Sequence, residues 1–394
     1  MIPSYYEFIN PVKIVSGTNA VDNIPHELDQ LGAKRPMVIT DQGVVMAGLL
    51  KYVEDAIEDS IATIGAVYDK TPPDSSLEVV REIAALYRSR NCDSFIAIGG
   101  GSAMDTAKGV NIIITENSDD LMQFIGADRL KNRLQPLIAI PTTAGTGSEV
   151  TLVAVVSDTA NNVKMPFTSS HLLPNVAIID PRMTLTLPPR LTAATAMDAM
   201  THAIESYYGT QKNPMSDAYA FAAIKILREN IVNAVKNGKD AGTRLAVANA
   251  ATMAGIAFSN SMVGLVHSLG HATGGICHVP HGVAMSIFLP FGMEYNLEKA
   301  GDHIGELLLP LGGSELYAAT PKAGRAESAI KIIRKLQTDL YHLCELPMTL
   351  KDAGVPRNKL EQIAQATMDD GALTYNPEVV TQADALRILK LAYE

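Results

Sequence analysis

Short apolar runs and amphipathic stretches alternate through the first half of the chain. Segments 75–90 and 102–115 carry apolar residues at helical spacing. Five mainly apolar runs predict β-strands, at 36–40, 61–68, 94–100, 136–143 and 176–180. These runs are continuous rather than alternating, which is typical of strands that helices cover on both faces. The pattern therefore predicts an α/β domain built on a parallel, doubly wound sheet.

The alternation stops where prolines accumulate, at Pro181, Pro188 and Pro189. The adjacent pair excludes a continuous helix or a central strand at that point. Beyond it nearly every segment has helical periodicity, as in 192–208, 214–235, 243–260, 262–275, 281–297, 325–345 and 384–393. We therefore expect two domains, an α/β domain of residues 1–184 and an all-helical domain of residues 185–394.

Composition narrows the class of protein. Of the 394 residues, 47% are hydrophobic and 19% are charged, which is ample for large cores. The formal net charge of -10 argues against non-specific binding to nucleic acids or anionic membranes. No run approaches the roughly 18 uninterrupted apolar residues of a membrane span, and "MIPSYYEFIN" lacks the features of a secretory signal. Three scattered cysteines give no disulfide framework, so we expect a cytoplasmic protein.

The stretch "FIAIGGGSAMDTAKG" (95–109) places three glycines between a buried strand and a helix that opens at Ser102. Glycines let the backbone approach a phosphate closely, and a helix N-terminus supplies unpaired N–H groups. The spacing is neither GxGxxG nor a P-loop. Alone, such a turn is as often a tight connection as a binding loop.

Two further loops favour a nucleotide. The stretch 141–149, "PTTAGTGSE", follows another predicted strand and offers hydroxyls from Thr142, Thr143 and Thr146. Asp41 follows the strand 36–40, where an acidic side chain can bind ribose hydroxyls and would repel a 2′-phosphate. Taken alone, Asp41 is equally well explained as a turn residue. Together the three loops predict a dinucleotide site that prefers NAD to NADP.

The apolar stretch "TAMDAMTHAIESY" (195–207) carries Asp198 and His202 four residues apart, on one helix face. Buried charges tend to be paired or to bind metal. Residues 245–298 contain no Lys or Arg, but they contain four of the nine histidines, namely His267, His271, His278 and His281. A lone buried histidine is usually a core residue, whereas this density favours a metal site. Spacing alone does not choose the ligands, and Cys277 with His278 would also suit zinc. A carboxylate with imidazoles is compatible with Fe²⁺ and with Zn²⁺.

Four motifs resemble the signatures of the iron-containing (group III) alcohol dehydrogenases, a family that includes lactaldehyde reductases and 1,3-propanediol dehydrogenases. They are "GGGSAMDTAKG", "PTTAGTGSEVT", "AMDAMTHAIESY" and "GLVHSLGH…PHGVAMSIFLP". The resemblance covers essentially the whole chain. It implies a Rossmann-like N-terminal domain, an all-helical C-terminal domain, and an active site in the cleft between them.

Carried over by position, the resemblance implies particular roles. The metal ligands would be Asp198, His202, His267 and His281. His271 would lie near the nicotinamide as a candidate proton relay. Cofactor contacts would come from Asp41, Gly99, Gly100, Gly101, Ser102, Asp105, Thr142, Thr143, Thr146, Val155, Lys164 and Leu185. Without the resemblance, Lys164 reads as a solvated surface lysine.

The chain departs from the family pattern in two places. Pro72 and Pro73 stand where members often carry Asn-Pro, so we expect one amide contact to the cofactor to be absent. Val153 stands where lactaldehyde-type members have a polar residue, which predicts a more apolar substrate pocket. Phe258 matches a pocket-lining aromatic, although plain core packing would also explain it.

The resemblance implies a metal-dependent, NAD-linked dehydrogenase that moves hydride reversibly between a small primary alcohol or diol and its aldehyde. A homodimer or larger homo-oligomer is expected. The alternatives on the same architecture are glycerol or glycerol-phosphate dehydrogenases and dehydroquinate-synthase-like lyases. Anionic substrates of such enzymes need cationic side chains near the metal, and residues 245–298 offer none.

Overall fold

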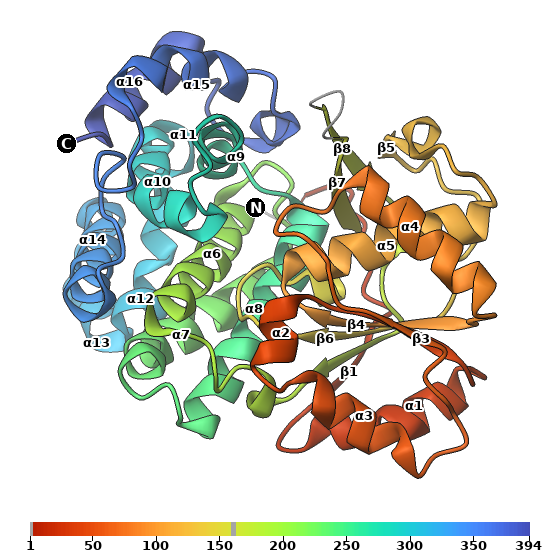
Figure 1. Cartoon of the computed structure of the whole chain (residues 1–394). Coiled ribbons are helices and arrows are strands. Elements are labelled where there is room, and N and C mark those ends of the chain that lie inside the picture. Colours follow the sequence, from red (N-terminus) through yellow and green to blue (C-terminus); the bar gives the residue numbers. More distant parts are fainter. Residues whose placement is uncertain (1–2, 159–162) are drawn as a thin grey trace. The chain divides into compact units, whose positions relative to one another are not determined.

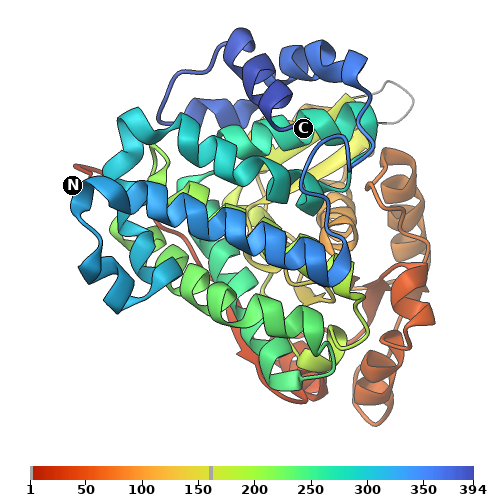
Figure 2. The ribbon, with the colours of Figure 1, turned by 90° about the vertical axis from the view of Figure 1, so that its left-hand side faces the viewer.

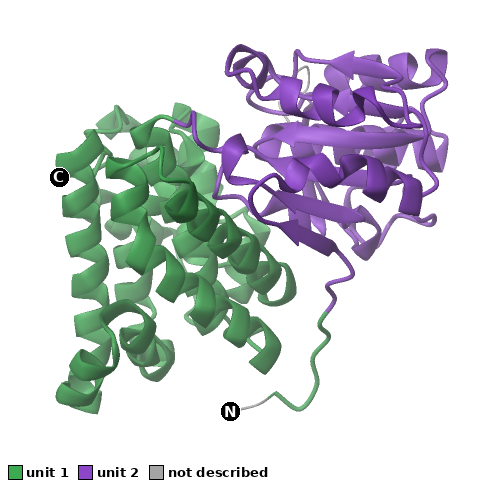
Figure 3. Ribbon diagram, turned by 90° about the horizontal axis from the view of Figure 1, so that it is seen from below, with its two compact units in different colours: residues 1–8, 188–394 green, residues 9–187 purple. Residues whose placement is uncertain are grey.

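The computed structural model describes residues 3–158 and 163–394, which group into two compact units (Figures 1 and 3). Residues 9–187 form an α/β unit. Residues 188–394, together with the N-terminal residues up to Phe8, form a helical unit. Among the described residues, no helix is long and apolar enough to cross a membrane.

A six-stranded parallel sheet forms the centre of the α/β unit. In spatial order its strands are β1 (Lys13–Ser16), β9 (Val176–Ile179), β6 (Leu137–Pro141), β4 (Ser94–Gly99), β2 (Pro36–Ile39) and β3 (Ala66–Tyr68). The predicted doubly wound fold is confirmed, and four of the five predicted strands match closely. The run 61–68 forms a strand only in its last three residues. The apolar-run pattern missed β1, because this edge strand is largely exposed.

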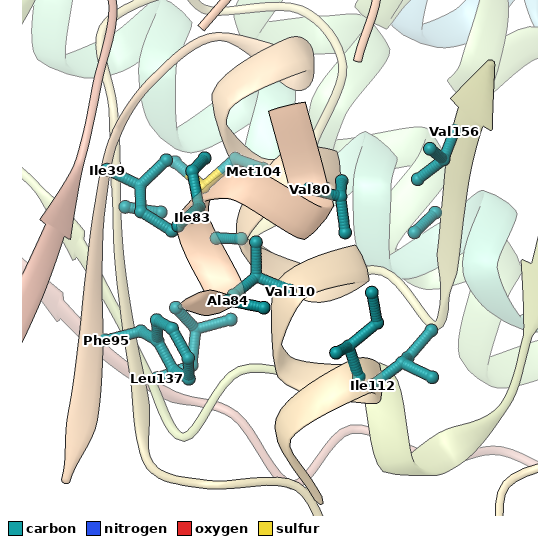
Figure 4. Packing of buried hydrophobic residues seen from close by; sticks show 14 of the residues in the cluster. Ile39, Val80, Ile83, Ala84, Phe95, Met104, Val110, Ile112, Leu137 and Val156 are labelled. Atoms are coloured by element: carbon teal, nitrogen blue, oxygen red, sulfur yellow. The ribbon is translucent and has the colours of Figure 1, made fainter. Parts of the chain in front are cut away.

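Helices cover both faces of this sheet. One face packs against α1 (Ile24–Gln30) and α3 (Leu50–Glu58), through side chains such as Val38 and Ile96. The other packs against α4 (Leu77–Ser89) and α5 (Gly101–Glu116), through alternate residues such as Phe95 (Figures 1 and 4). Burial on both faces explains why these strands are continuous apolar runs.

The winding of the chain changes direction between the neighbouring strands β2 and β4. After β2 the chain passes through α2 (Gln42–Met46) to α3, on one face. After the neighbouring strand β4 it enters α5, on the other face. Where adjacent parallel strands send their connections to opposite faces, open α/β sheets bind ligands at the carboxyl ends of the strands.

A second, three-stranded sheet was not predicted. It consists of β5 (Gly126–Ala127), β8 (Val163–Thr168) and β7 (Val153–Asp158), with β7 antiparallel to β8. Along β7, Ala154 and Val156 are buried while Val153 and Val155 remain partly exposed. This period of two in burial is typical of a strand with one covered face. Residues 153–156 are nevertheless continuously apolar in sequence, and the sequence interpretation missed this run.

The helical unit is arranged around α6 (Pro189–Tyr208), in which every residue from Ala196 to Tyr208 is buried. Pro189 is the first residue of α6, where its missing N–H has no intrahelical partner to lose, so the proline pair starts the helix. The helix packs against α7 (Pro214–Lys236), α8 (Ala241–Ser261) and α10 (His281–Tyr295).

The remaining helices complete this unit, and Figure 2 shows the long α14 running across it. They are α9 (Leu265–Cys277), α11 (Leu297–Glu306), α12 (Leu308–Gly312), α13 (Ser314–Ala319), α14 (Arg325–Cys344), α15 (Leu360–Thr367) and α16 (Gln382–Leu391). All seven predicted helices are present. The periodicity missed α11, α12, α13 and α15, which have ten residues or fewer.

The packing of α4 on the sheet gives a stability prediction. Ile83 is fully buried in this core, so Ile83→Ala is expected to cost about 2–5 kcal/mol in the free energy of unfolding. Arg88→Ala on the same helix removes only an exposed ion pair with Asp119 and is expected to cost under about 1 kcal/mol. Urea unfolding followed by circular dichroism measures both. Equal losses in the two variants would contradict the packing described.

Candidate metal centre and nucleotide cradle

The structure brings Asp198, His202, His267 and His281 together in the helical unit. One potential ligand atom from each lies within 4.8 Å of the others. Asp198 and His202 face the same side of α6, while α9 contributes His267 and α10 begins at His281. From the Asp198 Oδ1 atom, the distances to Nε2 are 3.2 Å for His281, 3.7 Å for His202 and 4.0 Å for His267.

The electrostatics of this cluster suit a cation. Burial lowers the pKa of His202 to about 3 and places that of His267 well below its ordinary value, so both imidazoles are neutral and offer lone pairs. Burial tends to raise the pKa of Asp198, but the nearby imidazoles outweigh it and lower that pKa. The buried Nε2 of His267 makes no hydrogen bond to any described residue. A divalent ion such as Fe²⁺ or Zn²⁺ would satisfy it.

Glu205 is a second buried acid at this centre, and the sequence interpretation missed it. Its Oε2 is 2.5 Å from Nδ1 of His267, and its Oε1 accepts a hydrogen bond from the Val266 N–H at 2.8 Å. Burial raises the pKa of Glu205 to about 7, against the lowering effect of backbone N–H donors. The signal was present in the sequence, because positions 198, 202 and 205 share one helix face.

His271 lies one helical turn beyond His267 on α9, and its side chain is 46% exposed. Its ring stacks on that of His281, with centroids 5.3 Å apart. The Nδ1 atom lies 2.8 Å from Oδ2 of Asp370, a residue that the sequence interpretation did not select. Burial raises the pKa of Asp370, but hydrogen bonding to His271 outweighs this and the pKa falls to about 2. No short-range pattern links positions 271 and 370, so only the fold reveals the pair.

Phe258 on α8 lies against the same cluster. Its ring stacks on His202, with centroids 4.2 Å apart and planes 18° apart. The residue is therefore in contact with a candidate ligand rather than only with the core. It covers one face of the His202 ring and excludes water from that face.

In the α/β unit, the three-glycine turn packs on the threonine loop. Gly99 in β4 pairs in register with Pro141 in β6, and the Thr142 N–H donates to the Gly99 carbonyl. Gly99 has φ +156°, and a Cβ atom added there would lie 2.6 Å from Cβ of Ala103. Glycine is therefore required at the entrance to α5.

The next two glycines face hydroxyl-bearing side chains. A Cβ added at Gly100 would lie 3.3 Å from Oγ1 of Thr143, and one added at Gly101 would lie 3.1 Å from Cγ2 of Thr146. The turn leaves the first N–H groups of α5 without a side-chain cap. A backbone surface of this kind can receive a phosphate group.

Asp41 lies at the adjacent strand end. It caps α2 by accepting a hydrogen bond from the Val44 N–H at 3.0 Å. A Cβ added at Gly99 would lie 3.4 Å from Oδ2 of Asp41, so the loops after β2 and β4 meet. An acidic side chain at such a strand end can bind ribose hydroxyls.

Ser102 and Asp105 of α5 bind other parts of the protein. The Ser102 hydroxyl donates to the Pro73 carbonyl. Asp105 accepts hydrogen bonds from the Ser148 hydroxyl at 3.0 Å and from the Val155 N–H at 3.2 Å. Burial raises the pKa of Asp105 to about 6, with Lys108 opposing the shift.

Lys108, which the sequence interpretation missed, is fully buried one turn further along α5. Its Nζ donates to the carbonyl oxygens of Thr151 at 2.8 Å and Val153 at 2.9 Å. Burial lowers its pKa to about 8. The lysine thereby anchors the start of β7, the strand that carries Val153 and Val155.

The last two predicted cofactor residues lie at other places in the unit. Lys164 is an exposed residue of β8, in register with Ser157. Leu185 is half-buried in the turn after β9 and the short helix Pro181–Met183.

The cluster predicts that the protein binds a metal ion, and His278 provides a matched control. We expect the protein to bind one Fe²⁺ or Zn²⁺ per chain, and His267→Ala to weaken that binding by at least tenfold, because it removes a buried nitrogen donor. His278→Asn alters an exposed histidine near the cluster and should leave the affinity unchanged. Asparagine tolerates the left-handed conformation of position 278, where φ is 56°. Metal analysis and calorimetric titration measure all three proteins, and equal affinities would contradict the assignment.

Comparison with known proteins agrees with this geometry. A family profile described as "Iron-containing alcohol dehydrogenase" matches residues 11–181, and one described as "Fe-containing alcohol dehydrogenase family, C-terminal" matches residues 192–393. The NAD-dependent methanol dehydrogenase of Bacillus methanolicus is 35% identical over 98% of this chain and 99% of its own length. Alcohol dehydrogenase 4 of Saccharomyces cerevisiae is 34% identical over 98% of both chains.

A solved structure extends the likeness to three dimensions. The crystal structure of a 1,3-propanediol oxidoreductase covers 99% of this chain and 100% of its own, with a TM-score of 0.94 and 33% identity. The two family profiles together span both units. The chain belongs to the iron-containing alcohol dehydrogenase family and is a metal-dependent alcohol dehydrogenase.

Proposed function

We propose that the protein transfers hydride reversibly between a small primary alcohol and NAD, using one divalent cation held by Asp198, His202, His267 and His281. The convergence of one buried carboxylate with three imidazoles carries this proposal. The NAD-dependent methanol dehydrogenase of Bacillus methanolicus, 35% identical along nearly the whole chain, supports the choice of cofactor.

The residues around the cation site have different roles. When bound, the cation supplies Lewis acidity toward the oxygen of an alcohol or carbonyl group. Asp198 supplies one negative charge and the imidazoles supply none, so the four ligands leave a net positive site. The carboxylate limits how positive that site becomes. Phe258 keeps water from one face of His202 and holds that ring in place.

The α/β unit supplies the cofactor contacts. NAD accepts or returns the hydride, and the protein's part is to fix its position. We assign the pyrophosphate to Gly99, Gly100 and Gly101 and the N-terminus of α5, with Thr142, Thr143 and Thr146 as hydroxyl donors. Asp41 binds the ribose hydroxyls and disfavours a 2′-phosphate. We assign further contacts to Ser102, Asp105, Val155, Lys164 and Leu185.

His271 holds and passes the proton that alcohol oxidation releases. Imidazole is the side chain that exchanges protons near neutral pH, and this one is partly exposed. Asp370 accepts from its Nδ1–H and leaves Nε2 available on the other side of the ring. The carboxylate with its lowered pKa stays ionised at neutral pH, so the orienting bond persists there.

The substrate we propose is a small primary monoalcohol or its aldehyde. We assign Val153 to the substrate pocket, where its isopropyl group would offer no hydrogen bond to a second hydroxyl. Among the relatives, one is named for methanol and one for 1,3-propanediol. We also propose a homodimer or larger homo-oligomer. The free thiols of Cys92, Cys277 and Cys344 support a cytoplasmic location.

An absorbance assay at the NADH band tests the function. Chelated protein is reconstituted with Fe²⁺ or Zn²⁺ and given NAD with ethanol, butanol or 1,2-propanediol. We expect turnover that depends on added metal and is faster with the monoalcohols. Full activity after exhaustive chelation would refute the metal-dependent mechanism. Silence with every alcohol in the presence of Fe²⁺ would refute the proposal and favour the lyase or glycerol-type alternatives.

Asp41 predicts the cofactor preference. Asp41→Ser keeps an oxygen that can cap α2 and removes the negative charge that repels a 2′-phosphate. The ratio of kcat/KM for NADP to that for NAD is expected to rise by about tenfold or more, or about 1.4 kcal/mol. Steady-state kinetics with both cofactors measures the ratio. An unchanged ratio would assign discrimination to other residues.

The role proposed for His271 predicts that its removal changes the pH dependence of kcat. His271→Ala removes the proposed proton carrier, so kcat for alcohol oxidation should fall by about 10²-fold or more and its dependence on pH should change. The pH–rate profile of the metal-loaded enzyme measures this. Wild-type and variant profiles of the same shape would remove His271 from the role.

A further inference from the structure

The N-terminus of α9, which carries His267, has no capping side chain of its own. Its N-cap residue is Gly264, and no side chain from the adjoining residues bonds to the first turn. The carboxylate of Glu205, from α6, lies there instead. It accepts a hydrogen bond from the Val266 N–H at 2.8 Å and is 1% exposed. A negative group at a helix N-terminus is favourable, so α6 caps α9 from outside.

The same carboxylate contacts the candidate ligand directly. Its Oε1 faces the Val266 N–H, and its Oε2 faces Nδ1 of His267 at 2.5 Å. The first partner is always a donor. When Glu205 is ionised, both of its oxygens can only accept, so the second partner must donate and the proton of His267 lies on Nδ1.

This proton position has a consequence on the opposite side of the ring. With the proton on Nδ1, the neutral imidazole keeps its lone pair on Nε2, the buried atom that lies 4.0 Å from Oδ1 of Asp198. With the proton on Nε2 instead, the lone pair would face away from the cluster. The tautomer that Glu205 selects is therefore the one that can bind a cation.

The other buried imidazole has no such partner. The Nδ1 atom of His202 makes no hydrogen bond to any described residue, and its ring is held by stacking on Phe258. Between His202 and His267, only the second is fixed in both orientation and proton position.

We propose that Glu205 is a positioning residue for the cation site. It sets the tautomer of His267, and because the same carboxylate caps α9, it also fixes the orientation of the His267 ring. The inference rests on the proposed metal site. Hydrogen-bonded partners of metal-ligating histidines typically change metal affinity by about 10–100-fold when they are removed.

Glu205→Gln tests this with little change in shape. An amide has one accepting oxygen and one donating nitrogen, so it cannot accept from both Val266 N–H and a protonated Nδ1. We expect the dissociation constant for Zn²⁺ or Co²⁺ to rise by about 10–100-fold. The absorption spectrum of the Co²⁺-loaded variant should also differ from that of the wild type.

Asp370→Asn is the matched control, because Asp370 bonds to Nδ1 of His271, one turn along α9, and His271 is not a candidate ligand. We expect its metal affinity to equal that of the wild type. A Glu205→Gln variant with wild-type affinity but a lower melting temperature would overturn the proposal, since it would leave a capping role alone. If the wild type itself binds no metal, the proposed function fails instead.

A second measurement needs no substitution of Glu205. Nitrogen-15 NMR of histidine-labelled metal-free protein reports which ring nitrogen carries the proton, and comparison with His267→Gln assigns the signal. The Nδ1–H tautomer at His267 is expected. The Nε2–H tautomer there would overturn the proposal even if Glu205→Gln did not fold.

Discussion

A carboxylate buried among imidazoles is the constraint on which the helical unit depends. Asp198 lies in an α6 segment whose residues are all buried, and water does not reach it to offset the cost of its charge. His202, His267 and His281 meet this carboxylate from three helices, and a cation between them would offset the cost. The arrangement of α6, α9 and α10 is therefore tied to the chemistry as well as to apolar packing.

The α/β unit meets a different constraint, which is steric. The glycine turn after β4 lies against the threonine loop after β6, and Ala103 leaves no room for a side chain at position 99. Because Gly99 pairs with Pro141, the loops after β4 and β6 begin side by side. The chain after β2 turns to the other face of the sheet, and Asp41 lies next to Gly99. Backbone surface is thereby left available where a phosphate-bearing cofactor needs it.

Much of this could be predicted from the sequence, because the relevant signals are local. Continuous apolar runs indicated the buried strands, and the i, i+4 spacing of Asp198 and His202 indicated a shared helix face. The exposed edge strand β1 has only two apolar residues and left no signal of that kind, whereas the apolar run at the start of β7 was overlooked.

The partners of the site residues were harder to find. Glu205 left a usable signal, since its spacing continues the same helix face. Asp370 left none, because it reaches His271 from 99 positions away. Lys108 looked like an ordinary helix lysine, and only its burial against Thr151 and Val153 shows its part in placing β7.

The four candidate ligand side chains differ in exposure, so the centre has a buried side and a side that faces solvent. Those of Asp198, His202 and His267 are between 3% and 6% exposed, whereas that of His281 is 39% exposed. Three ligands thus form a rigid inner wall, and the fourth stands at the solvent boundary. His281 is thus the donor that solvent reaches, and we expect ions and small molecules to enter and leave the centre from its side.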